Sequence, residues 1–113
     1  MAFKELSQPE VDRLLAAERI ARIGFDADGE RYLVPLGFVW HEGALCAMTT
    51  LGRKTRMAAT NPHVSFQVDT SATTGPFSWQ SVSGAGTFEI VTDPSRIEGI
   101  AARLTERFPD MPA

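Results

Sequence analysis

The spacing of apolar residues along the chain predicts three helices. Ser7 followed by Glu10 has the spacing of a capping box, and the apolar residues that follow recur at helical intervals. A second, short helix is predicted over residues 53–60, because Asn61-Pro62 would end it. The third helix begins at Asp93-Pro94, a capping residue followed by a proline at the first helical position.

The first predicted strands form a hairpin. Residues 19–25 alternate in side-chain polarity, and a turn-forming segment follows at residues 26–29. Residues 32–40 then pair back and are almost all apolar, which predicts burial on both faces, as in a barrel wall or at a subunit interface. Pro35 and Gly37 predict a kink near the middle of this strand, because proline lacks a ladder donor and glycine lacks a side chain.

Three further strands are predicted from apolar or alternating runs, at residues 44–48, 64–69 and 77–91. Gly84 and Gly86 are expected to bend the last of them, and residues 70–76 are expected to form a flexible loop. Short hairpin loops imply an antiparallel sheet, and about five or six strands of this length tend to close as a small barrel. The predicted fold class is therefore mainly β, in an α+β arrangement: a small antiparallel barrel with flanking helices, in one domain spanning residues 1–113.

A cluster of basic residues opens the second predicted helix. Arg53, Lys54 and Arg56 fall in its first turn, where the helix dipole favours acidic side chains. Three cations without an acid are unfavourable there unless an anion lies among them. A phosphate would fit, held by helix N–H groups, by Arg53 and Lys54, and by the hydroxyls of Thr49 and Thr50. The alternative is a solvated basic face on a surface helix.

Composition narrows the class of ligand. The net charge is −3 and the isoelectric point is near 5.3, which argues against a nucleic-acid binder and favours a small anionic ligand. The single cysteine, Cys46, is expected to be a buried, reduced thiol, and with His41 and His63 it makes no metal-ligand set. The sequence contains no apolar run long enough for a membrane span and no signal-peptide pattern, so we expect a cytoplasmic protein.

Four passages between Leu6 and Val91 together resemble the pyridoxamine 5′-phosphate oxidase-like split-barrel superfamily, whose members bind FMN. They are Val34–Phe38, Leu45–Lys54, Asn61–Asp69, and Trp79–Val82 with Gly86. The most similar branch is that of the small nitroimidazole-resistance proteins. The resemblance implies a Greek-key-like split barrel and a homodimer with the flavin at its interface.

The resemblance also implies roles for single residues. Arg53 and Lys54 would hold the flavin phosphate, with hydroxyl bonds from Thr49 and Thr50. Val34, Pro35 and Leu36 would offer apolar contact and backbone groups to the flavin ring. Gln80 or Ser81 would hydrogen-bond the ring from a neighbouring strand, in this chain or in the partner subunit. No catalytic residue is assigned.

Three departures from the family pattern bear on function. Residues 79–83 contain no arginine, whereas true pyridoxamine phosphate oxidases use an arginine-rich strand on the substrate, so that substrate is not expected. The histidine that some nitroimidazole-resistance relatives place near Met48 is absent. The family usually adds a final strand after the last helix, and none is predicted here, so we expect either a barrel that is closed differently, for example by the partner, or a protein that is truncated relative to its relatives.

These observations favour an FMN-dependent oxidoreductase that acts on a small molecule, with no nucleic-acid or membrane partner. One alternative keeps the fold and uses the deazaflavin coenzyme in place of FMN. Another is a flavin- or haem-binding protein without turnover. The lack of an acid–base constellation is compatible with flavin chemistry, because the cofactor carries the electrons.

Overall fold

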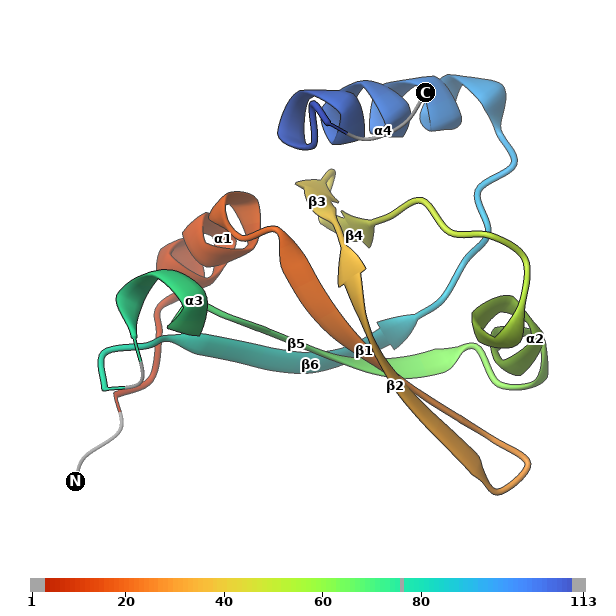
Figure 1. Ribbon diagram of the computed structural model, residues 1–113, viewed down its shortest axis with the longest axis horizontal. Helices are drawn as coiled ribbons and strands as arrows, with labels where there is room; N and C mark the ends of the chain where they lie inside the picture. Colours follow the sequence, from red (N-terminus) through yellow and green to blue (C-terminus); the bar gives the residue numbers. More distant parts are fainter. Residues whose placement is uncertain (1–3, 76, 111–113) are drawn as a thin grey trace.

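The computed structural model describes residues 4–75 and 77–110, and its main feature is a twisted antiparallel sheet flanked by helices (Figure 1). The helices are α1 (Gln8–Ala17), α2 (Arg53–Thr60), α3 (Ser71–Thr74) and α4 (Pro94–Arg107). The strands are β1 (Ile20–Ala27), β2 (Glu30–Gly37), β3 (Val39–His41), β4 (Ala44–Cys46), β5 (His63–Asp69) and β6 (Ser81–Thr87).

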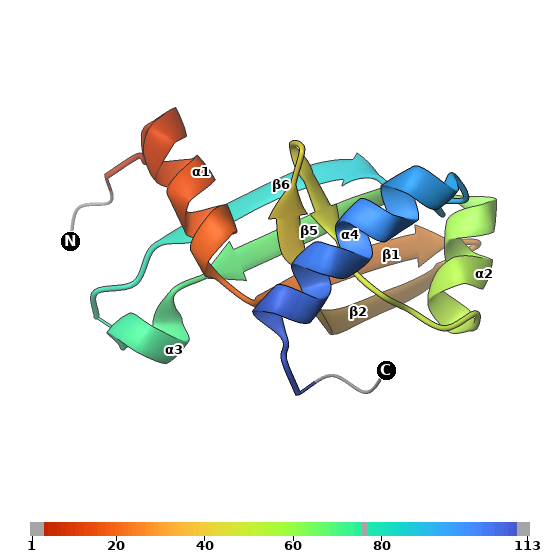
Figure 2. The same cartoon turned by 90° about the horizontal axis from the view of Figure 1, so that it is seen from above.

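Four strands form one sheet in the order β2-β1-β5-β6, and β3 and β4 form a separate two-stranded hairpin. Seen from above, α1, α4 and the β3–β4 hairpin overlie the four-stranded sheet (Figure 2). The predicted class, α+β with an antiparallel sheet and flanking helices, is confirmed. Among the described residues, however, the two sheets do not join, so the barrel is not closed within this chain.

The β1–β2 hairpin follows directly from its sequence. Along β1, the side chains of Ala21, Ile23 and Phe25 are buried and the alternate positions face outward, as predicted. The turn consists of Asp28 and Gly29, whose φ angles are 52° and 77°. Positive φ at both central residues is what a two-residue type I′ hairpin turn requires, and aspartate followed by glycine is a preferred pair for it.

The prediction that residues 32–40 are buried on both faces is wrong for the single chain. β2 is an edge strand with one half-buried face, and Leu33 on its other face is 71% exposed. In place of the predicted kink, the ladder with β1 runs unbroken through Pro35 and the strand ends at Gly37; Phe38 is buried in the core, and β3 begins in the second sheet. The sequence offered a barrel wall or a subunit interface as the reason for so apolar a strand. The subunit interface stays a prediction.

The second half of the chain differs from expectation in its strands. The segment predicted as a loop over residues 70–76 contains the short helix α3; Pro76 lies outside the described residues. β6 covers only Ser81–Thr87 of the predicted 77–91 strand, and β4 ends two residues early. Gly84 and Gly86 do not interrupt β6, which pairs with β5 along its whole length. Gly84 instead leaves room for the ring of Phe66, which would lie 2.8 Å from an added Cβ atom.

The core lies between the sheet and the helices on one side of it. Its largest fully buried side chains are Phe38 and Val68, and Leu14 and Leu15 of α1 join them. The predicted caps of α1 and α4 are confirmed. Ser7 and Glu10 form both bonds of the capping box, and the carboxylate of Asp93 accepts from the backbone N–H of Ser95. The caps set where α1 and α4 begin, and the core residues support the sheet on which the candidate site is built.

Candidate functional site

The predicted phosphate-binding segment lies at the N-terminus of α2, beside the tip of the β1–β2 hairpin. α2 begins at Arg53, as predicted, and its first turn is closed by Thr55, whose hydroxyl accepts from the Gly52 N–H at 2.9 Å. Met57 and Ala58 are buried and pack the helix against the core. Arg53, Lys54 and Arg56 are therefore held in the first turn of a firmly packed helix.

The structure corrects one premise of the phosphate argument, because an acid does lie among the three cations. Glu30, the first residue of β2, accepts from Nε of Arg53 at 2.9 Å and from its Nη2 at 2.8 Å, both through Oε2. The Arg56 guanidinium lies 3.9 Å from the same oxygen. Sequence reasoning missed this contact because Glu30 comes from a different element, although a returning strand after Asp28-Gly29 places residue 30 at the hairpin tip.

Arg53 has a second partner that the sequence did not indicate. Its guanidinium lies 4.2 Å from the centroid of the Tyr32 ring, within the range of a cation–π interaction. Tyr32 and Glu30 lie on the same face of β2, two residues apart. The orientation of the Arg53 guanidinium is thus set by two groups: the Glu30 carboxylate at its Nε–Nη2 edge and the Tyr32 ring against its face.

Lys54 and the two threonines are placed near this cluster with fewer contacts. The Lys54 ammonium forms no ion pair with residues 4–75 or 77–110. Thr49 and Thr50 are exposed in the segment between β4 and α2, and the Thr49 hydroxyl donates to the Thr50 carbonyl at 3.3 Å. Of the three cations in this turn, Lys54 is thus the one without an ion-pair partner among the described residues.

The predicted ring-contact residues continue the same row of β2. Val34 and Leu36 follow Glu30 and Tyr32, the two residues that contact Arg53 of α2, on the half-buried face of β2. Pro35 lies on the opposite, exposed face.

The outer edge of β2 also carries unpaired backbone groups. The Phe38 N–H donates to the Arg19 carbonyl at 2.9 Å, which fixes the alternation of the β1–β2 ladder. Val34 and Leu36 therefore turn their backbone groups toward β1, whereas Leu33 and Pro35 turn theirs outward. Proline is tolerated at such an outward position because it has no N–H to donate. The edge of β2 thus presents the Leu33 N–H and two carbonyls to any ligand that lies along it.

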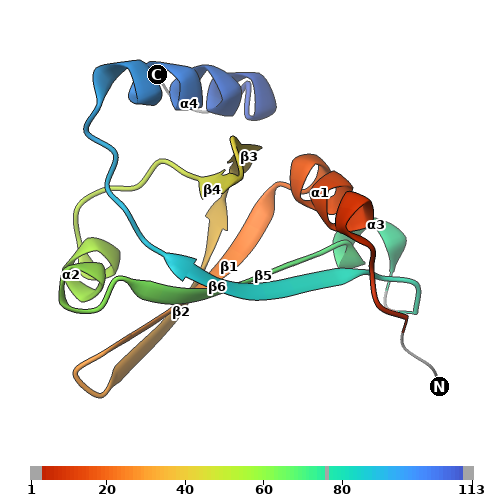
Figure 3. The same cartoon turned by 180° about the vertical axis from the view of Figure 1, so that it is seen from behind.

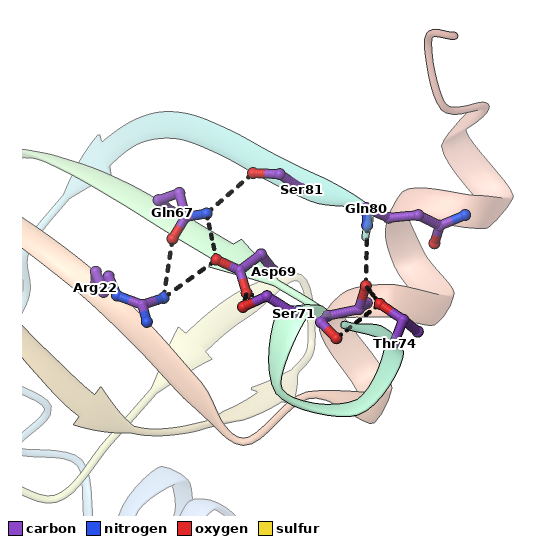
Figure 4. A network of polar contacts seen from close by, with 8 residues as sticks. Arg22, Gln67, Asp69, Ser71, Thr74, Gln80 and Ser81 are labelled. Atoms are coloured by element: carbon purple, nitrogen blue, oxygen red, sulfur yellow. Dashed lines mark hydrogen bonds and ion pairs between the residues drawn. The ribbon is translucent and has the colours of Figure 1, made fainter. Parts of the chain in front are cut away.

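Ser81 belongs to a polar network at the far end of the sheet (Figure 4). Its hydroxyl accepts from Nε2 of Gln67 at 3.0 Å, and the same nitrogen donates to Asp69 at 2.8 Å. Nη1 of Arg22 reaches Oε1 of Gln67 at 3.2 Å and Asp69 at 3.4 Å. Hydrogen bonds from the hydroxyl of Ser71, and then from Gln67, lower the pKa of Asp69 to about 2. Asp69 is therefore a fixed negative charge near neutral pH.

Gln80 lies beside this network without joining it. Its backbone N–H donates to the Thr70 hydroxyl at 2.9 Å, and its side chain extends away from Arg22 and Asp69 (Figure 4). α2 and α3 lie at opposite ends of β5, as the views from front and back agree (Figures 1 and 3). Because β5 has 7 residues, the two ends are about 20 Å apart. Within one chain, Gln80 and Ser81 are not brought together with Arg53 and Lys54.

Sequence reasoning also missed a hollow where β2 ends. A pocket of about 320 Å³ opens beside Gly37 and is lined largely by apolar side chains, among them Met48, Leu104 and Phe108. The Phe108 ring lies against Gly37, 3.2 Å from where a Cβ atom would be. The C-terminal end of α4 thus closes over the edge of β2 next to the predicted ring-contact residues.

Neither a metal centre nor a membrane-spanning helix is found in the described ranges. Within residues 4–75 and 77–110, no three or more His, Cys, Asp or Glu side chains are grouped so that they could hold a metal ion. No helix in the same part of the chain is long and apolar enough to cross a membrane. Burial raises the pKa of the Cys46 thiol, which keeps it protonated and weakly reactive.

Comparison with solved structures identifies proteins of the same fold. An FAD-binding protein from Mesorhizobium loti is 28% identical, with a TM-score of 0.77 over 93% of this chain and 75% of that one. An FAD-binding protein from Mycobacterium smegmatis is 27% identical, with a TM-score of 0.65 over 80% of this chain and 82% of that one. A conserved hypothetical protein from Mycobacterium tuberculosis is 20% identical, with a TM-score of 0.81 over 96% and 68% of the two chains.

The family follows from the sequence match. No protein with a curated description matches the chain. Residues 7–112, nearly the whole chain, match the family described as pyridoxamine 5′-phosphate oxidase. The match does not single out the nitroimidazole-resistance branch, which stays a prediction. With its four family-like passages, its antiparallel sheet and its basic turn at α2, the chain belongs to the pyridoxamine 5′-phosphate oxidase family.

Proposed function

We propose that this protein binds FMN along the outer edge of β2 and works as a flavin-dependent oxidoreductase on a small molecule. The observation that carries the proposal is the single row on β2, where Val34 and Leu36 continue the line of Tyr32, over which Arg53 lies. Lys54 follows Arg53 in the first turn of α2, at the end of this row where the phosphate would bind. When bound, the flavin supplies hydride and electron transfer.

The residues present fit a flavin phosphate and a flat ring. Lys54, the first N–H groups of α2 and the hydroxyl of Thr50 just before the helix are donors of the kind that bind a phosphate. The outward backbone groups of Leu33 and Pro35 can pair with polar atoms on the rim of a ring. The pocket beside Gly37 would then leave room for a small substrate next to the ring.

We further propose that the working unit is a homodimer. If Ser81 or Gln80 contacts the flavin, the contact must come from a second copy, because these residues lie at the other end of the sheet from α2. The exposed Leu33 and Pro35 give β2 an apolar outer face that a second copy would cover. Gel filtration with and without FMN tests this, and a folded monomer that binds FMN would contradict it.

The cofactor is tested by an absorbance titration of the purified protein with FMN, with FAD and with the deazaflavin coenzyme. FMN should produce bound-flavin peaks and the tightest binding. If the deazaflavin coenzyme binds more tightly than FMN, the deazaflavin coenzyme is the better assignment for the cofactor. A folded protein that binds none of them would refute the proposal.

Replacement of Lys54 by alanine tests the phosphate site. Lys54→Ala should weaken FMN binding by about tenfold, in line with the loss of one charge-assisted hydrogen bond, and should leave riboflavin binding unchanged. Lys4→Ala is the matched control, since Lys4 is an exposed lysine in the segment before α1. Equal FMN affinity in the two variants would contradict the phosphate assignment.

The two similar proteins are described by the flavin that they bind and not by a reaction, which keeps a second candidate, a flavin-binding protein without turnover. The two candidates differ in hydride transfer. Anaerobic addition of a reduced nicotinamide should bleach the flavin absorbance if the protein is an oxidoreductase. Bound flavin that no nicotinamide donor reduces would favour the second candidate.

A further inference from the structure

Glu30 provides an internal anion at the place where the ligand phosphate is expected. Its Oε2 atom takes both Nε and Nη2 of Arg53, at 2.9 and 2.8 Å. The Nε–Nη2 side of a guanidinium is a fork of two donors, the arrangement that grips carboxylates and phosphates. In this structure that fork is occupied by a side chain of the same chain.

The surroundings of Arg53 leave it little freedom to turn toward another anion. One face of the guanidinium lies over the Tyr32 ring at 4.2 Å, and Arg56 approaches the same Glu30 oxygen at 3.9 Å. A phosphate that reaches Arg53 must therefore displace the Glu30 carboxylate or be held beside it. A phosphate held beside the Glu30 carboxylate would be attracted by Lys54 and repelled by Glu30.

We propose that Glu30 is a built-in competitor for the ligand phosphate and reduces the advantage that a doubly charged phosphate has at the α2 site. This inference rests on the proposed flavin site. Glu30 cancels one of the three positive charges of the turn, so each unit of charge on the phosphate is bound less strongly. A terminal phosphate such as that of FMN carries close to two charges at neutral pH, and each phosphate of a diphosphate diester such as FAD carries one. Glu30 therefore disfavours FMN more than it disfavours FAD.

Because of its position in the hairpin, Glu30 can compete with the ligand phosphate while contributing little to the stability of the fold. It directly follows the Asp28-Gly29 turn, and its side chain is 36% exposed. Its partners are likewise exposed, at 46% for Arg53 and 66% for Arg56. Exposed ion pairs contribute little to stability, so the charge can be removed from a protein that still folds.

The test is a titration of Glu30→Gln with FMN, FAD and riboflavin. Two unit charges ~4 Å apart in water interact strongly enough to change affinity about fivefold for each unit of ligand charge. Glu30→Gln should therefore bind FMN about 10- to 25-fold more tightly than the wild type, bind FAD about fivefold more tightly, and bind riboflavin equally. Raising the salt concentration should shrink these differences, because both charges are exposed.

Glu42→Gln is the matched control. Glu42 is 80% exposed, lies in the β3–β4 turn and loses the same charge without touching α2. It should leave all three affinities unchanged. FMN binding that is weaker or unchanged in Glu30→Gln would overturn the proposal; weaker binding would mean that Glu30 orients Arg53 for the phosphate.

Inorganic phosphate separates this inference from the proposed function. Phosphate should raise the melting temperature of Glu30→Gln by more than that of the wild type, since a ligand stabilises in proportion to its affinity. If no variant binds any flavin, the proposed function falls, and the phosphate result still decides the role of Glu30. An equal rise in the two proteins would overturn the competitor role.

Discussion

Replacing Gly84 by alanine would place a methyl group where the Phe66 ring now lies. The new Cβ atom would be 2.8 and 2.9 Å from two atoms of that ring, closer than real Cβ contacts allow. Phe66 is paired with Gly84 across β5 and β6 and packs against the core, so its ring can move only by giving up contacts there. Overpacking of this kind costs about 1–3 kcal/mol of unfolding free energy, or roughly 4–12 °C in melting temperature for a domain of this size.

Gly86 gives a matched control two residues along the same strand. An added Cβ at Gly86 meets nothing within 4 Å, and neither glycine has a positive φ. Gly86→Ala should therefore be neutral or should stabilise by up to about 1 kcal/mol, through the smaller entropy of the unfolded chain. Urea unfolding followed by tryptophan fluorescence measures both variants. Equal stability of Gly84→Ala and Gly86→Ala would refute the steric argument, and Phe66→Leu should recover part of the loss in the Gly84→Ala background.

Two further predictions concern the polar contacts. Because the pKa of Asp69 is lowered in the folded protein to about 2, its contribution to stability is complete above pH 4 and is lost as the pH falls toward 2. The melting temperature of Asp69→Asn should accordingly change less between pH 5 and pH 2 than that of the wild type; parallel curves would contradict this. Ser7→Ala removes the side-chain bond to the Glu10 N–H and should cost about 1 kcal/mol in urea unfolding, whereas Ser83→Ala on β6 should cost less.

The parts of the fold that could be predicted are those governed by neighbours in sequence. The caps at Ser7 and Asp93 need only residues within one turn, and the buried face of β1 needs only alternation. The errors arose where contacts with residues distant in the sequence determine the local structure. β6 pairs with β5 straight through Gly84, where the glycine makes room for the Phe66 ring of β5, and no pattern within residues 77–91 contains that ring.

The candidate site divides in the same way. The dipole argument indicated correctly that three cations in the first turn of α2 need an anion, and the structure supplies one from 23 residues away, in Glu30. What local reasoning could not supply is which anion satisfies which cation. Arg53 is matched inside the chain by Glu30 and Tyr32, while Lys54 has no ion-pair partner in residues 4–75 and 77–110. If the turn binds a phosphate as proposed, the affinity should depend on Lys54, and the contribution of the already neutralised Arg53 should depend on Glu30. Lys54→Ala and Glu30→Gln should therefore change FMN affinity in opposite directions, and a turn that were only a solvated basic face would respond to neither.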